Sequence, residues 1–202
     1  MPDPDGLTIA QRHARLHDQI QLLIDRAPQD GKTPIALRAI APALIALAQQ
    51  LKHLQYYVLQ SRDGNWLLTT LQNNDDPELE KAVVYGFPSI DDARSSLKSP
   101  VKPDLVAVSM PIAQILFQLL AFDRIDSAIF FDQAGSRERG IEIQRRELQQ
   151  LANAHLQKLI AETQAANQAA SQATSQAASQ AANQAPPAKN VKPRRNIPSN
   201  LA

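Results

Sequence analysis

The chain has 202 residues, no cysteine and a formal net charge of +1. Its length suits one domain of ordinary size with an appendage, and the lack of cysteine excludes disulfides, thiolate metal sites and cysteine nucleophiles. The acidic start lacks the basic flank and apolar stretch of a secretory signal, so the expected location is cytoplasmic. Prolines or charged residues interrupt each long apolar stretch, so we expect no membrane span.

Two helices are predicted at the beginning of the chain. Thr8 can cap the first, in which apolar residues recur every three or four positions until the chain approaches Pro28. Thr33 is the predicted cap of the second, which has a proline in its first turn and runs to about His53. Pro42 should kink or split this second helix, because proline removes one backbone hydrogen bond and crowds the preceding turn.

A β-hairpin is predicted next. Residues 56–61 and 66–71 are rich in strand-forming side chains, and they flank Asp63 and Gly64. An Asp-Gly pair accepts the positive φ angles of a tight reverse turn. The two segments are therefore expected to pair with each other.

The middle of the chain alternates short strands and helices. Strand signals occur at 82–87, 105–108 and 127–131, and helix signals follow Ser89 and Ser109. Both serines are interpreted as caps, since a serine side chain accepts hydrogen bonds from the free N–H groups of the first turn. This order predicts an α/β (α+β) fold, in which a mixed sheet of about five strands carries flanking helices.

A long helix is predicted to close the folded part. Gly135 and Gly140 bracket an expected turn, residues 141–143 can pair briefly, and the helix starts near Arg145. Its apolar stripe consists of Leu148, Leu151, His155, Leu156, Leu159 and Ile160. This stripe is expected to dock on the body or on a partner.

The C-terminal part has a different composition. Glutamine recurs every four residues from Gln164 to Gln184, among small and polar residues. Without large apolar side chains, this segment is predicted to be a flexible or transiently helical linker, followed by a disordered basic tail. The sequence thus divides into an N-terminal helical segment (1–54), an α/β body with its closing helix (55–163), and a low-complexity linker with the tail (164–202).

Short segments between residues 82 and 151 carry a family resemblance. They are Tyr85-Gly86-Phe87-Pro88-Ser89, Val108-Ser109-Met110-Pro111, the stretch 129–132, and Gly140-Ile141-Glu142-Ile143. Together they resemble the strand-helix-strand-helix-strand run in the N-terminal domain of the SseB family, bacterial proteins named for an enhanced serine-sensitivity phenotype. The resemblance implies that fold but no reaction, because the family has no well-defined catalytic residues.

Two groups of polar residues are interpreted as solvated surface. His13 and His17 are four residues apart on the first predicted helix, but no third ligand stands near them, so no metal or cofactor is expected. The arginines near the expected turn are interleaved with glutamates, which is typical of a solvated turn and helix start. They are Arg137, Arg139, Arg145 and Arg146.

Three carboxylates, Asp123, Asp126 and Asp132, bracket the strand at 127–131. They could bind a cation or act as acid and base at the end of a sheet. No phosphate-binding loop, histidine base or second carboxylate motif accompanies them. The favoured interpretation is that they end elements and stay hydrated.

Neighbouring aromatic residues supply the candidate contact surface. Side chains alternate along a strand, so Tyr56 and Tyr57 face opposite sides of the sheet, as do Phe130 and Phe131. One residue of each pair is expected to be exposed, and Tyr57 and Phe131 are the candidate binding residues.

These patterns favour a non-catalytic protein-binding or adaptor protein rather than an enzyme. The body would present a docking surface to another protein, and the tail would add reach and a weak basic contact. The basic tail residues are Lys189, Lys192, Arg194 and Arg195. One alternative is a small-ligand protein or enzyme that uses the carboxylates near Asp126 and Asp132, and another is weak nucleic-acid association through the tail. The oligomeric state stays open.

Overall fold

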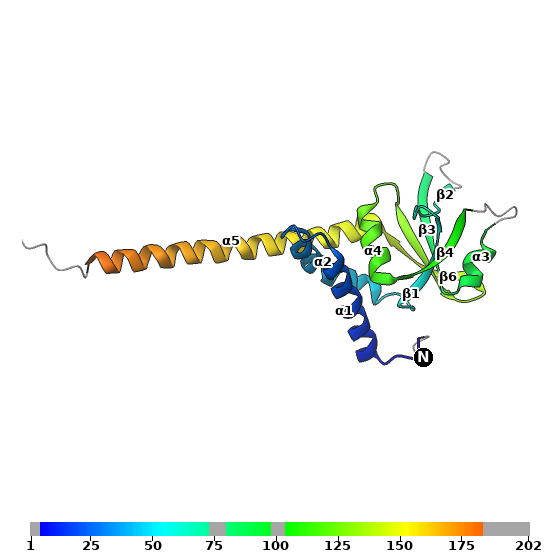
Figure 1. Ribbon diagram of the computed structural model, residues 1–202, viewed down its shortest axis with the longest axis horizontal. Coiled ribbons are helices and arrows are strands. Elements are labelled where there is room, and N and C mark those ends of the chain that lie inside the picture. The colour runs from blue at the N-terminus through cyan, green and yellow to red at the C-terminus, as the bar shows by residue number, and fades with distance from the viewer. Residues whose placement is uncertain (1–4, 73–79, 98–103, 184–202) are drawn as a thin grey trace, which may run out of the picture. The chain divides into compact units, whose positions relative to one another are not determined.

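The computed structural model describes residues 5–72, 80–97 and 104–183 (Figure 1). The chain divides into two compact units, one ending at Leu159 and the other beginning at Ile160. The first unit combines helices with a mixed sheet, which confirms the predicted α+β class. No helix within the described ranges is both long enough and apolar enough to cross a membrane.

The first helix, α1 (Ile9–Arg26), starts as predicted. The N–H of Gln11 donates to Thr8 Oγ1 at 3.3 Å, and the Gln11 side chain in turn accepts from the N–H of Thr8 at 2.9 Å. Two of the free N–H groups at the helix start are thereby satisfied. The buried residues of α1 follow at four-residue spacing, as one face of a helix requires: Leu16, Ile20 and Ile24.

The second helix, α2 (Thr33–Ala48), corrects two expectations and narrows a third. Its N-terminal acceptor is Asp30 and not Thr33: the Asp30 carboxylate accepts from the N–H of Lys32 at 2.9 Å and from the N–H of Thr33 at 2.7 Å. The helix runs through Pro42, which lies on its exposed side, so the split does not occur, whereas the alternative of a kink stays a prediction. It also ends well before His53.

Within the described ranges, six strands form one sheet, in the order β4-β1-β3-β5-β6 with β2 beside β3. Its strands are β1 (Gln55–Ser61), β2 (Thr69–Gln72), β3 (Glu80–Phe87), β4 (Leu105–Pro111), β5 (Ser127–Gln133) and β6 (Ser136–Gln144). The pair β3–β5 is parallel and the other pairs are antiparallel, so the sheet is mixed, as predicted.

The predicted hairpin forms only in part. Its turn is present, with Gly64 at φ +84°, and the N–H of Leu67 donates to the carbonyl of Leu59 at 2.8 Å. After Leu67 the chain diverges from β1, and β2 pairs with β3. The long partner of β1 is instead β4, from Gln55 against Pro111 to Ser61 against Leu105, because this pairing covers the whole strand.

One other local prediction is wrong, and another holds only in part. Ser109 lies inside β4 and caps no helix; α4 (Ile112–Ala121) begins directly after Pro111, and the Ser109 hydroxyl donates to Gln55 Oε1 at 3.3 Å. Gly140 lies within β6, which is longer than the expected pairing at 141–143, and the turn before β6 is made by Gly135 at φ +77°. In both places a strand continues through residues that had been assigned to a helix start or a turn.

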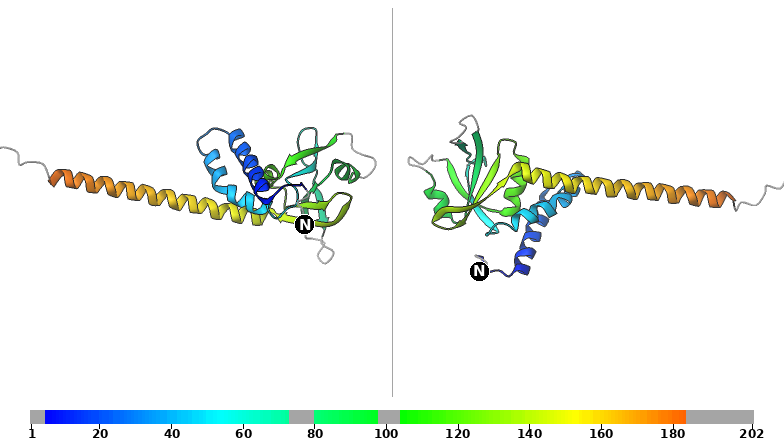
Figure 2. Two further views of the ribbon diagram at one scale, coloured as in Figure 1. Left: turned by 90° about the horizontal axis from the view of Figure 1, so that it is seen from below. Right: turned by 180° about the vertical axis from the view of Figure 1, so that it is seen from behind.

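The helices cover the two faces of the sheet unequally. The face that carries Tyr56, Val58 and Phe130 forms the main core with α1, α2, α4 and the start of α5. On the opposite face lies α3 (Ile90–Ser95), which Ser89 caps as predicted. Figures 1 and 2 show α1, α2 and α4 on one side of the sheet and α3 on the other.

The last helix, α5, spans Arg145–Asn183. In the first unit it buries Leu148 and Ala152, whereas Leu151 is 36% exposed, so the stripe that docks is narrower than predicted. In the second unit residues 164–183 are helical, and the prediction of a flexible or transiently helical linker stays a prediction as regards flexibility. Alanine has the highest helix propensity, which favours a helix in this segment although it has no large apolar side chains to pack. Residues 184–202, with the basic tail, lie outside the described residues.

Candidate functional site

A groove lies on the sheet face that α3 shares. We call it the aromatic groove, and its principal lining residues are Leu59, Tyr85, Phe87, Ile129, Phe131 and Arg137. It has a volume of about 580 Å³. Alternation along β1, β3 and β5 brings these side chains to one face, since each strand contributes every second residue.

Three aromatic rings form the floor of the aromatic groove. The ring of Phe131 lies 5.6 Å from that of Tyr85, nearly parallel to it, and 5.4 Å from that of Phe87, measured between centroids. Tyr85 and Phe87 are 6.1 Å apart. Each distance lies in the range of favourable aromatic contacts, so the rings hold one another in place.

Ser96, directly after the short helix α3, lines the aromatic groove, and Asp92 holds this helix in position. The N–H of Asp92 donates to Ser89 Oγ at 3.1 Å, and the Asp92 carboxylate accepts from the N–H of Gly135 at 2.8 Å. This second bond ties α3 to the turn between β5 and β6. Because α3 has only six residues, it packs on this face through Ala93, beside the buried Phe87, and Tyr85 stays half-buried.

Arg137 of β6 lines the same groove. Its guanidinium carbon lies 5.7 Å from the centroid of the Phe87 ring, within the range of a cation–π contact. Among the residues that the structure describes, Arg137 is the charged side chain of the lining, and none of the ion pairs there involves it. Arg137 is exposed, in agreement with its interpretation as a solvated residue, but the sequence did not show its contact with Phe87.

The two aromatic residues predicted to bind lie on this face in different settings. Phe131 belongs to the floor of the aromatic groove but is only 8% exposed, so the expectation that it is freely exposed is wrong. Tyr57 is half-buried and lines a neighbouring groove with His53 and Ser109. Their partners Tyr56 and Phe130 are 0% exposed, as alternation requires.

The structure does not bring the predicted carboxylates together. Asp126 and Asp132 lie at opposite ends of β5, about 20 Å apart at the usual rise per strand residue. Asp126 Oδ2 accepts from the N–H of Ala82 at 2.8 Å, and Asp123 pairs with Arg145. These contacts fix the ends of strands and the start of α5, and they form no shared acid–base site.

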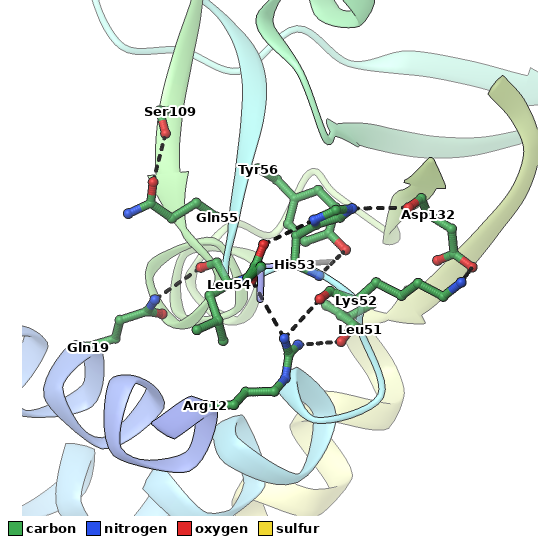
Figure 3. Close-up of polar contacts among 11 residues, drawn as sticks. Arg12, Gln19, Leu51, Lys52, His53, Leu54, Gln55, Tyr56, Ser109 and Asp132 are labelled. Atoms are coloured by element: carbon green, nitrogen blue, oxygen red, sulfur yellow. Dashed lines mark hydrogen bonds and ion pairs between the residues drawn. The ribbon is translucent and has the colours of Figure 1, made fainter. Parts of the chain in front are cut away.

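Asp132 takes part in a polar network around the connection between α2 and β1 (Figure 3). Its carboxylate lies 3.4 Å from the ammonium of Lys52, and its carbonyl oxygen lies 3.0 Å from His53 Nε2. On the other side of the imidazole, Nδ1 lies 3.3 Å from the Asp5 carboxylate. The histidine therefore links the beginning of the chain to β5.

The remaining bonds of this network satisfy backbone groups. The guanidinium of Arg12 donates to the carbonyls of Leu51 and Lys52, the latter at 2.8 Å. The N–H of His53 donates to the Tyr56 hydroxyl at 3.2 Å, and burial raises the pKa of Tyr56 to about 12. The network thus stabilises an irregular segment of backbone, and its ionisable groups are engaged in that structural role.

The other sequence candidates are placed as follows. His13 and His17 are exposed on α1, with ring centroids 5.1 Å apart. Within the described ranges, no group of three or more histidine or carboxylate side chains is arranged to hold a metal ion. Lys189, Lys192, Arg194 and Arg195 lie outside the described residues.

Fold and geometry define a mixed α+β protein with an aromatic groove on the less covered face of its sheet. No family model, curated protein or solved structure shows a significant match to this chain. The resemblance to the SseB family therefore stays a prediction from the sequence.

Proposed function

We propose that this chain is a non-catalytic protein-binding protein, an adaptor that docks another protein through its aromatic groove. The observation that carries the proposal is the floor of packed rings beside a helix of only six residues. Binding energy at protein interfaces concentrates in a few aromatic and arginine residues that are well packed and shielded from water. Tyr85, Phe131 and Arg137 are of these types and line one groove.

The surroundings of the carboxylates favour binding over catalysis. A general acid or base needs a partner within reach of the same reacting atom. Asp123 instead contacts the side chain of Arg145, and Asp126 contacts the backbone N–H of Ala82. Asp132 contacts the side chain of Lys52. We also propose that the tail beyond residue 184 contributes a weak, salt-dependent contact to the partner.

Crosslinking with full-length protein, followed by affinity capture and mass spectrometry, tests this proposal. Tyr85→Ala removes one ring of the floor, and Phe122→Ala is its matched control, because Phe122 is a 41% exposed aromatic residue outside the groove. A partner that is captured by the wild type and by Phe122→Ala, but lost with Tyr85→Ala, supports the proposal. Equal capture by all three proteins contradicts it.

Deletion of residues 164–202 separates the role of the groove from that of the tail. The truncated protein should still capture the same partner, with reduced recovery at low salt, because the groove lies entirely in the first unit. Complete loss of the partner on truncation would assign docking to the second unit instead.

A further inference from the structure

We infer that the segment bound in the aromatic groove is a peptide whose apolar side chain is flanked by a carboxylate, and that Arg137 selects that carboxylate. The inference rests on the proposed function and adds the chemistry of the partner. Its basis is the juxtaposition of one guanidinium with a floor of aromatic rings.

The position of Arg137 gives the groove a fixed charge. The Phe87 ring lies 5.7 Å below the guanidinium carbon, and Phe87 is itself only 1% exposed and packed against Phe131. A cation–π contact at this distance leaves the N–H groups of the guanidinium available, and a carboxylate can accept two of them side by side. The contact therefore keeps the cation at the groove, where it can meet a ligand.

The rest of the lining determines which ligand fits. It consists of aliphatic and aromatic side chains together with the hydroxyl-bearing residues Thr69 and Ser96, and no carboxylate lines it in the described part of the chain. An apolar side chain of the partner would displace water from the rings. A basic partner would bring a second cation close to Arg137 and would be repelled, so the charge of the groove excludes it.

The same reasoning disfavours a second copy of the chain that inserts its own basic tail. That tail carries Lys189, Lys192, Arg194 and Arg195 and no acid. A foreign segment with aspartate or glutamate beside a phenylalanine or leucine complements both features of the groove at once.

Fluorescence anisotropy with three synthetic peptide pools tests the inference on the full-length chain. Each pool carries a central phenylalanine or leucine, and its flanking positions are all aspartate or glutamate, all serine, or all lysine. The acidic pool should bind about ten-fold more tightly than the serine pool, the gain of one charge-assisted bidentate contact. The lysine pool should bind most weakly, and added salt should reduce the difference.

Substitutions at Arg137 make the test specific. Arg137→Gln should abolish the preference for the acidic pool while the serine pool binds as before, and Arg137→Glu should shift the preference to the lysine pool. Arg139→Gln is the matched control, because Arg139 is an exposed arginine of the same strand that does not line the groove. It should leave the preference unchanged.

The outcomes distinguish the inference from the proposed function. Binding that is lost with Tyr85→Ala but is equal for all pools, or unchanged in Arg137→Gln, overturns the inference and leaves the docking groove intact. No binding of any pool overturns the inference, and the capture experiment with Tyr85→Ala then decides the proposed function by itself. Peptide binding that is unchanged in Tyr85→Ala overturns both. A preference for the acidic pool that Arg139→Gln removes as well overturns the role of Arg137.

Discussion

Replacing Gly86 by alanine tests how tightly β3 packs against the main core. A Cβ atom at this position would lie 2.6 Å from Cδ1 and 3.0 Å from Cε1 of the Phe130 ring. Favourable carbon–carbon contacts are about 3.5–4.0 Å long, so the ring would have to move by roughly 1 Å. Phe130 is 0% exposed and lies 4.9 Å from the Tyr56 ring, which leaves it little room.

The expected cost of Gly86→Ala follows from these contacts. Overpacking of a filled core costs about 1–3 kcal/mol, and replacing glycine inside a strand recovers about 0.5–1 kcal/mol of backbone entropy. The difference of the two ranges is centred on about 1 kcal/mol, which is the net loss that we expect in the free energy of unfolding. With an m-value near 2 kcal/mol/M, the urea midpoint should fall by roughly 0.5 M.

Urea unfolding monitored by tryptophan fluorescence measures this loss. Trp66 is the single tryptophan of the chain, is 9% exposed and packs edge-on against Phe122, so it reports on the first unit. Phe130→Leu is the companion variant, because a smaller side chain makes room for the new methyl group. The double variant should lose less stability than the two single losses together, by about 1 kcal/mol. A urea midpoint of Gly86→Ala equal to that of the wild type would refute the close packing described here. So would a double variant whose loss of stability equals the sum of the two single losses.

Three further predictions concern other parts of the chain. Arg12→Lys should lower stability by about 1–3 kcal/mol, because the compact ammonium group lacks the two separate nitrogens with which the guanidinium reaches the carbonyls of Leu51 and Lys52; an unchanged urea midpoint would contradict this. Asp30→Asn should destabilise near neutral pH and not in acid. Hydrogen bonds from the N–H and then the hydroxyl of Thr33 lower the pKa of Asp30, so its stabilisation is present above the unfolded-state value of about 3.9 and is lost as the pH falls through the folded-state value. Thermal unfolding of the wild type and of Asp30→Asn, measured near neutral pH and in acid, checks this. A difference in Tm between the two proteins that does not depend on pH would count against it. Ala170→Pro should reduce helical circular dichroism but leave the Trp66 transition in place; an unchanged helical signal would show that this segment is not helical.

Features that depend on neighbours a few residues away could be predicted from the sequence. Thr8 and Ser89 cap helices because the N–H that each accepts lies three residues further along the chain. Alternation likewise predicted that Tyr56 and Tyr57 face opposite sides of the sheet. Asp30 was not recognised as the acceptor because Thr33, which can also cap a helix, stands directly before the proline.

Pairing between distant segments could not be predicted in the same way. The sequence around Asp63 and Gly64 favours a hairpin, and the turn forms, but the strand after it finds a better partner in β3. Whether β1 pairs with its sequence neighbour or with β4 depends on which arrangement closes the core, and no local pattern carries that information.

Arg137 was missed for a related reason. The register between β5 and β6 shifts between Phe131 and Gln133, which marks a bulge or irregularity in the pairing. Irregular pairing redirects side chains, so alternation along β6 does not show that Arg137 lies over Phe87. The aromatic residues of the groove could therefore be recognised in the sequence as strand residues, whereas its charged residue, Arg137, could not be assigned to it.

The pairing of β1 with β4 has a consequence for how the chain acquires its structure. Gln55 pairs with Pro111 and Ser61 pairs with Leu105, so β1 cannot pair with β4 until residues far along the chain have been synthesised. Closing such a large loop costs entropy before any contact is gained, which slows the search for the native arrangement. We expect the first unit to refold in milliseconds to seconds rather than microseconds in stopped-flow mixing, and nascent chains that end before Leu105 to need protection against aggregation.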